Sequence, residues 1–171
     1  MKRLLSILLS AILFFGVFIS LAASDELSKD GWTITASSAK DPAERAIDSD
    51  TSTIWHSNYK AEGSTITEKD SAPYTLEVTI PDVATVSGFR YYPREGGSSS
   101  GIAKSAELYL SADGKKFTKV GEIVYSQDDS NRNARETLFS GNVKIKAFRY
   151  VITNAVNGFG TCAELALLNE N

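Results

Sequence analysis

The residues best suited to chemistry are gathered between positions 46 and 59, where oxygen-bearing side chains precede the only histidine of the chain. Asp48, Asp50 and Thr53 alternate with turn-forming residues, as a compact loop around a hard cation requires. His56 follows directly after Trp55, a residue that we expect in the core. The stretch therefore indicates a binding loop.

The elements that must position this loop have the pattern of β-strands. Between Tyr74 and Ile80 apolar and polar side chains alternate with period two, so the apolar ones should face a core and Glu77 should face solvent. Similar short runs are found at residues 32–37, 86–92, 106–111, 117–120, 136–139, 143–154 and 163–168. No segment has a convincing helical period.

Turn signals separate these runs. They are found at Pro81-Asp82, residues 96–101, Asp113-Gly114, Gly141-Asn142 and Asn157-Gly158. About eight such strands predict an all-β fold in which two antiparallel sheets form a sandwich. Because the chain has no internal repeat and no long linker, we expect one domain.

The N-terminal residues are typical of a secretory signal. Lys2 and Arg3 precede an uncharged apolar run from Leu4 to Leu21, and small residues follow. We place a signal peptide at residues 1–23 and the mature domain at residues 24–171. A retained single-pass anchor is the alternative, because the run approaches the roughly 20 apolar residues that span a bilayer. We therefore expect a secreted, periplasmic or cell-surface protein.

The charge and the cysteine content exclude some classes of partner and bond. Removal of Lys2 and Arg3 would leave 16 basic against 21 acidic residues, a formal charge of −5. Nucleic acid and anionic membrane lipid are therefore poor partners. Cys162 is the only cysteine, so the chain forms no intramolecular disulfide, and we expect this residue to be small and buried rather than reactive.

Six segments of the chain, in order, resemble the discoidin or factor V/VIII C-type domains, and most closely the bacterial family 32 carbohydrate-binding modules. The segments lie within residues 46–57, 73–78, 86–94, 111–117, 148–151 and 163–165, and they include Trp55-His56-Ser57, Pro93-Arg94 and Ala163-Glu164-Leu165. The resemblance covers nearly the whole mature chain and implies a galactose-binding-like β-sandwich jelly roll. Eukaryotic members usually carry a disulfide between the ends of the domain, so its absence favours the bacterial branch.

The resemblance also implies a structural calcium ion. By position, its ligands would be the side chains of Asp48, Thr53 and Glu164 and backbone oxygens at or near Arg45, Asp50, Thr53 and Ala163. Ca²⁺ prefers such oxygens, and a carboxylate in the apolar last strand needs a cationic partner. The alternative is that Asp48 and Asp50 only cap a turn. No adjacent base suggests metal catalysis.

A sugar site at one end of the sandwich is the other implication of the resemblance. It would lie on the loops that carry His56, Arg94 and Phe159. We expect His56 and Arg94 to be exposed and to donate hydrogen bonds to sugar hydroxyls, with Tyr59 or Phe159 as the ring beneath the apolar face of the sugar.

Two further residues complete the candidate site, and each member has a plainer alternative. Ser100 stands where many sugar-binding members have Asn, and Asn157 precedes the glycine of the predicted turn. The lone histidine can be a surface or structural residue, and Arg94 can form a solvated ion pair with Glu95 or Glu62.

These patterns together predict a non-catalytic carbohydrate-binding module for terminal sugars, of the galactose type because the His/Arg pair of the family commonly grips an axial hydroxyl. Cell-surface adhesion or protein interaction of the discoidin type is the alternative. Membrane lipid is a weaker partner, because residues 96–101 carry no aromatic or basic side chain. An enzyme such as a small glycosidase is least favoured, because no nucleophile and base with a supporting third group are evident.

Overall fold

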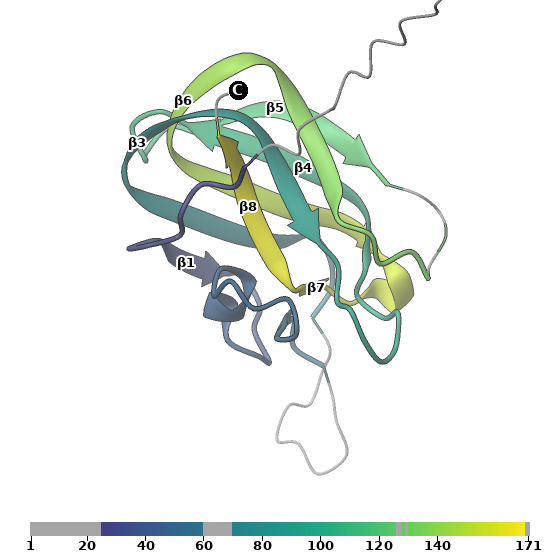
Figure 1. Ribbon diagram of the computed structural model, residues 1–171. Coiled ribbons are helices and arrows are strands. Elements are labelled where there is room, and N and C mark those ends of the chain that lie inside the picture. Colours follow the sequence, from purple (N-terminus) through teal and green to yellow (C-terminus); the bar gives the residue numbers. More distant parts are fainter. Residues whose placement is uncertain (1–24, 60–69, 126–127, 129, 170–171) are drawn as a thin grey trace, which may run out of the picture.

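The computed structural model describes residues 25–59, 70–125, 128 and 130–169 of the chain (Figure 1). The predicted signal peptide at residues 1–23 lies outside the described residues, as does Glu62. Within them the strands are β1 (Thr33–Ala36), β2 (Trp55–His56), β3 (Tyr74–Tyr92), β4 (Ala103–Ser111), β5 (Thr118–Val124), β6 (Arg135–Ala155), β7 (Thr161–Cys162) and β8 (Glu164–Asn169). Two short 3-10 turns, η1 (Ala43–Ala46) and η2 (Val156–Gly158), are the only helical elements of the described part. The predicted all-β fold is confirmed.

The strands pair antiparallel in two groups. The larger sheet has the order β1-β3-β6-β4-β5 with β8 also paired to β3, and the smaller one consists of β2 and β7. The first half of β3 pairs with β1 and with the second half of β6, whereas the second half of β3 pairs with β8 and with the first half of β6. β3 and β6 therefore bend together and contribute to both layers of the sandwich (Figure 1).

Two predicted turns are bends inside these long strands. Pro81-Asp82 lies within β3, where the register to β6 shifts between Thr79 and Ala84. Gly141-Asn142 lies within β6, where the register shifts opposite Ser87. The prediction that these dipeptides separate strands was wrong, because local irregularities in pairing let a strand bend without reversing.

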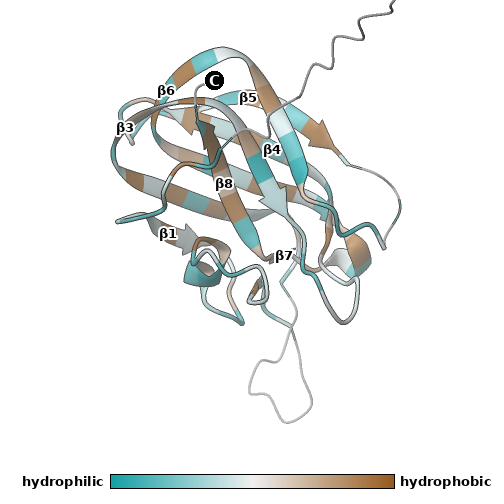
Figure 2. Ribbon diagram, in the orientation of Figure 1, coloured by the Kyte–Doolittle hydropathy of each residue, from teal (hydrophilic) through white to brown (hydrophobic). Residues whose placement is uncertain are grey.

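The alternation predicted for the first half of β3 is confirmed. Tyr74, Leu76 and Val78 are fully buried, and Ile80 is 1% exposed. The intervening polar residues are partly exposed, and the Glu77 carboxylate accepts a hydrogen bond from Arg149 Nε at 2.6 Å. Figure 2 shows this alternation as changing colours along β3 and a nearly continuous apolar β8. Because β8 is buried on both faces, its sequence has no period of two.

Both tryptophans belong to the core, as predicted. Trp55 is fully buried and donates from Nε1 to the Ser38 carbonyl at 2.9 Å, and Trp32 packs edge-on against Phe148. Cys162 is a buried free thiol, and burial raises its pKa well above the ordinary value, so it is inert as a nucleophile. The described residues contain no helix long and apolar enough to cross a membrane.

Candidate functional site

The candidate sugar site begins where β2 pairs with β7. His56 lies opposite Thr161 in this pair. The next residue, Ser57, donates its N–H to the Gly160 carbonyl at 2.9 Å, and its hydroxyl accepts from the Gly160 N–H at 3.0 Å. A Cβ at Gly160 would lie 2.8 Å from the Tyr74 ring, so glycine alone lets the turn approach the core this closely. These contacts place two distant segments side by side.

Three aromatic rings meet at this junction. The centroids of His56 and Tyr59 are 4.6 Å apart, those of His56 and Phe159 are 5.7 Å apart, and those of Tyr59 and Phe159 are 6.2 Å apart. Tyr59 and Phe159 are half-buried, but His56 is only 9% exposed. The expectation that His56 is exposed was therefore wrong, because the two neighbouring rings cover its imidazole.

The hydrogen bond of His56 assigns its two ring nitrogens. Nδ1 lies 2.8 Å from the Ser57 carbonyl oxygen, which can only accept, so Nδ1 carries the proton. Burial lowers the pKa of His56, the bond to Ser57 opposes this effect, and Arg94 lowers the pKa while Asp41 raises it. At neutral pH the ring is uncharged, and Nε2 is an acceptor instead of the donor expected from the sequence.

Arg94 lies on the loop that follows β3, and its positive charge is one of the causes that lower the pKa of His56. The Arg94 side chain is half-buried and donates from Nε to the Gly96 carbonyl at 3.1 Å. Gly97 has a φ of +70°, and a Cβ there would lie 3.2 Å from Arg94 Nη2. The Glu95 carboxylate, one predicted partner of Arg94, accepts a hydrogen bond from the Thr51 hydroxyl.

The structure also brings Ser100 and Asn157 together. Asn157 Nδ2 donates to Ser100 Oγ at 2.8 Å, and Ser98 Oγ donates to Ser100 Oγ at 2.9 Å. Asn157 and Gly158 form the predicted turn, with φ values of 56° and 66°. Because the same turn leads into Phe159, this polar pair lies next along the chain to the aromatic cluster.

The arrangement can hold a small polyol with an apolar face. We call His56, Tyr59, Arg94 and Phe159 the rim site. It combines one neutral acceptor, one guanidinium donor and two half-buried rings. A hydroxyl group is both donor and acceptor, so its chemistry suits an acceptor such as His56 Nε2 as well as a donor such as the Arg94 guanidinium.

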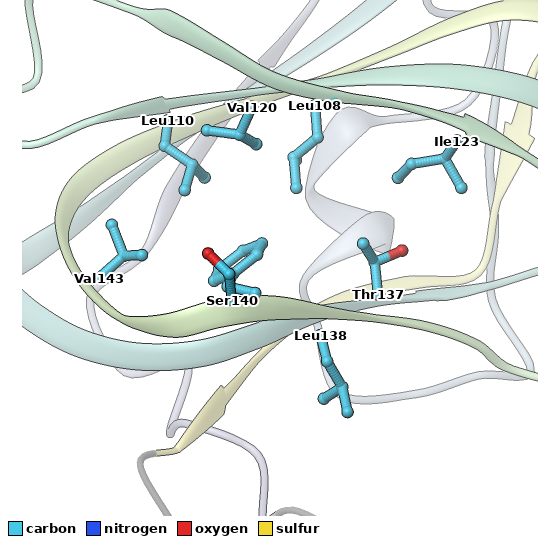
Figure 3. Close-up of a pocket in the computed structure, with 10 residues that line it drawn as sticks. Leu108, Leu110, Val120, Ile123, Thr137, Leu138, Ser140 and Val143 are labelled. Atoms are coloured by element: carbon cyan, nitrogen blue, oxygen red, sulfur yellow. The ribbon is translucent and has the colours of Figure 1, made fainter.

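A cavity in the sheet lies away from these residues. It has a volume of about 430 Å³ and lies between β5, the second half of β4 and the first half of β6 (Figure 3). Its walls are mainly apolar and include Leu108, Leu110, Ile123, Leu138 and Phe139. No charged side chain lines it, and among its lining side chains only the hydroxyls of Thr137 and Ser140 can form hydrogen bonds, so it lacks a charged donor such as the Arg94 guanidinium.

The predicted calcium ligands converge in part. Thr53 Oγ1 lies 2.7 Å from Asp48 Oδ2, 3.2 Å from the Asp50 carbonyl oxygen and 3.5 Å from the Arg45 carbonyl oxygen. The Asp50 carboxylate instead accepts from the backbone and the hydroxyl of Ser52, which lowers its pKa. The Asp50 carboxylate therefore caps a turn, as the alternative predicted, while the Asp50 carbonyl oxygen accepts a hydrogen bond from the Thr53 hydroxyl.

Glu164 joins the same loop from the start of β8, directly after the buried Ala163. Its Oε1 accepts from the Ser49 N–H at 2.6 Å, and its Oε2 forms an ion pair with Lys29. Burial raises the pKa of Glu164, while Lys29 lowers it. The role of Lys29 was missed, because no local pattern connects it with a residue 135 positions away.

The oxygen atoms of this loop fit a hard cation only if backbone carbonyl oxygens complete the ligand set. No group of three or more His, Cys, Asp or Glu side chains that could hold a metal lies within the described residues. Asp48 and Glu164 are the two carboxylates, and Thr53 and carbonyl oxygens make up the rest. Such mixed oxygen sets suit Ca²⁺. The Lys29 ammonium already neutralises the Glu164 carboxylate, so it would compete with a calcium ion for this group.

Comparison with known proteins gives a match over most of the chain. A family model described as F5/8 type C domain matches residues 33–165. Galactose oxidase from Gibberella zeae is 33% identical over 145 residues, which is 81% of this chain and 20% of that protein. A type blood N-acetyl-alpha-D-galactosamine deacetylase from Flavonifractor plautii is 28% identical over 148 residues, 85% of this chain and 18% of that protein. The chain spans about a fifth of the length of these relatives.

Solved structures match over a similar length. The family 32 carbohydrate-binding module of Clostridium perfringens NanJ, in complex with galactose, has a TM-score of 0.72 and 25% identity, covering 85% of this chain and 98% of that one. Another C. perfringens module, in complex with GalNAc-β-1,3-galactose, has a TM-score of 0.72 and 26% identity, covering 84% and 99%. The galactose-binding-like sandwich predicted from the sequence is confirmed by these matches.

Proposed function

Because the chain belongs to the F5/8 type C domain family, we propose that it is a non-catalytic carbohydrate-binding domain whose rim site holds a terminal sugar of the galactose type. The sequence motifs implied this family, and relatives in complex with galactose and with a GalNAc-galactose disaccharide support the class of ligand. A secreted or cell-surface location would give the site access to glycans, in keeping with the signal peptide predicted at residues 1–23.

One observation carries the proposal, namely the assignment of His56 Nε2 as a neutral acceptor within reach of the Arg94 charge. A hydroxyl between the two can donate to Nε2 and accept from the guanidinium. An ionised carboxylate or phosphate cannot donate, so it would leave Nε2 without a partner. The position between His56 and Arg94 should therefore take a sugar hydroxyl in preference to a carboxylate or phosphate.

The rings supply the other half of the recognition. Phe159 and Tyr59 are half-buried at an angle to each other, and each keeps part of its surface open. In galactose the axial hydroxyl leaves one face of the pyranose rich in C–H groups, which pack well on an aromatic ring. Phe159 follows the turn at Asn157-Gly158 and is the stronger candidate for this platform.

We predict weak but selective binding of galactose. Affinity for the monosaccharide should be on the order of 0.1–1 mM, because an open site buries little area and exchanges hydrogen bonds with water for bonds with protein. Calorimetric titration with galactose, N-acetylgalactosamine and glucose measures it, and glucose, which differs from galactose at the hydroxyl on C4, should bind more weakly. Absence of binding to these sugars and to a glycan array would contradict the proposal and favour protein interaction instead.

A structural calcium ion belongs to the same proposal. Asp48, Thr53 and Glu164 would hold it, with backbone oxygens of Arg45, Asp50 and Ala163. Together with the Lys29 ammonium, the positive charge of the ion would offset the cost of burying the Glu164 carboxylate, since burial raises the pKa of this group even with Lys29 beside it. The ion would thereby stabilise the loop that leads into β2 and the rim site.

Calcium should raise the melting temperature of chelator-treated protein. A ligand that binds only the folded state stabilises it by about 2.7 kcal/mol at a hundredfold excess over its Kd, which corresponds to a rise of roughly 5–10 °C for a domain of this size. Glu164→Gln should remove most of this rise, whereas Glu122→Gln, on the exposed side of β5, should retain it. Superimposable melting curves with calcium and with chelator would rule the site out.

A further inference from the structure

Arg132 connects two distant parts of the structure. Its Nη1 donates to the Arg94 carbonyl and its Nη2 to the Gly97 carbonyl, each at 2.9 Å. The two carbonyls lie 38 and 35 residues away in sequence. A planar guanidinium can reach both at once, whereas an ammonium group offers no such fork. Arg132 therefore spans the turn on which Arg94 is mounted.

The segment that carries Arg132 is itself anchored to the core. Arg135 donates from Nη1 to the Ala103 carbonyl at 2.5 Å and from Nη2 to the Asn131 carbonyl at 3.1 Å. The Arg135 guanidinium lies 4.6 Å from the centroid of the Tyr125 ring, and Tyr125 stacks on the buried Tyr91 ring at 5.6 Å. Asn131, the residue before Arg132, is therefore held by Arg135, which in turn contacts the sheet through its cation-π contact with Tyr125 and its hydrogen bond to Ala103.

The loop that Arg132 holds needs such support. Residues 95–98 are exposed, and they include Gly96 and Gly97. Glycines lose more backbone freedom on ordering than other residues, so a ligand that had to order this loop would bind more weakly. The bond from Arg94 Nε to Gly96 lies within the loop and moves with it. The Thr51–Glu95 hydrogen bond and the Arg132 fork attach the loop to the rest of the domain.

We propose that Arg132 is a positioning residue of the rim site: it fixes the Arg94 loop so that the guanidinium faces His56 before the sugar arrives. The inference rests on the proposed role of Arg94 in sugar binding. Both terminal nitrogens of Arg132 donate to backbone carbonyls, so Arg132 influences sugar affinity through the position of Arg94. Pre-organisation of this kind strengthens binding by lowering the entropy cost of ordering the loop.

The test compares Arg132→Gln with Arg149→Gln. Arg149 is a matched control, because it pairs with Glu77 on the outer face of β6 and makes none of the rim contacts described here. Arg132→Gln should weaken galactose binding roughly tenfold or more, since two charge-assisted bonds are lost, while Arg149→Gln should bind as the wild type does. Hydrogen–deuterium exchange of the residue 95–98 amides should become faster in Arg132→Gln alone. A purely structural role would change the melting temperature without changing affinity at a temperature where the protein is folded.

The outcomes separate the two proposals. If the wild type binds no sugar, the proposed function fails and the role of Arg132 fails with it. If the wild type binds and Arg132→Gln binds equally well, only the positioning role is overturned. Weaker binding with unchanged exchange at residues 95–98 would also overturn it, because Arg132 would then act on the sugar directly. Arg132→Lys can form only one of the two hydrogen bonds at a time, so its galactose affinity should lie between that of the wild type and that of Arg132→Gln. It replaces Arg132→Gln in the test if the glutamine variant does not fold.

Discussion

Arg94→Ala is expected to abolish measurable galactose binding without unfolding the domain. The side chain is half-buried and donates a hydrogen bond from Nε to the Gly96 carbonyl of its own loop, so its loss leaves the core intact. Charge-assisted hydrogen bonds contribute about 1.5–3 kcal/mol each, so a site that starts near 1 mM would fall beyond the range of calorimetry. Titration of the variant with galactose, beside a melting curve, measures both effects.

Alanine is a poor test substitution at His56, because the imidazole is buried rather than exposed. Its ring packs on Tyr59 and Phe159, so His56→Ala would open a gap and disturb the platform as well as remove Nε2. His56→Phe keeps a ring of similar size and removes the acceptor, and it should bind no galactose while remaining folded. Lys144→Ala, an exposed change on β6, is the control and should bind normally. Wild-type affinity in both Arg94→Ala and His56→Phe would place the site elsewhere.

The fold was largely predictable because its information is local. Period two between Tyr74 and Ile80 fixes which side chains face the core, and the structure buries those residues. Pro81 and Gly141 were misjudged for the same reason: dipeptides that favour turns in isolation are tolerated at bends where neighbouring strands stay paired on either side. Local propensity signals a change of direction but not its angle.

The site was predictable only as a set of residues. Motif order predicted that His56, Arg94 and Phe159 share one site; the structure places the His56 ring against Phe159, and the charge of Arg94 lowers the pKa of His56. The chemical state of His56 could not be predicted, because it depends on the backbone carbonyl of Ser57 and on burial by neighbouring rings. Sequence order says which side chains meet, whereas protonation depends on what else surrounds them.

Long-range ion pairs and carbonyl contacts were outside the reach of sequence patterns. Lys29 meets Glu164 across 135 positions, and Arg132 meets the Arg94 carbonyl across 38. Lysine and arginine in loops are ordinarily solvated, so neither residue stands out in the sequence. Both act on residues that the motifs did identify, which suggests that the supporting contacts of a site are harder to predict than the groups that touch its ligand.

The state of His56 leads to the second large effect, a loss of galactose binding in acid. The pKa of His56 is lowered below its ordinary value of 6.5, chiefly by burial, so the ring is neutral at pH 7 and Nε2 accepts. As the pH falls through the lowered pKa, Nε2 gains a proton and can no longer accept the sugar hydroxyl. The binding constant should then fall roughly tenfold for each further pH unit.

Nuclear magnetic resonance can follow this titration directly, because untagged protein has one histidine and therefore one set of imidazole C–H signals. Saturating galactose should lower the pKa of His56 further, since the sugar binds the neutral form. Asp41→Asn should also lower it, because the Asp41 charge raises the pKa of His56, and the acid loss of binding should move to lower pH in step. A folded state with a lowered histidine pKa also loses stability as the pH falls through that pKa, so a melting curve at each pH must show that the protein is folded. Binding that tightens in acid would mean that His56 donates to the sugar, and the acceptor role assigned to Nε2 would be wrong.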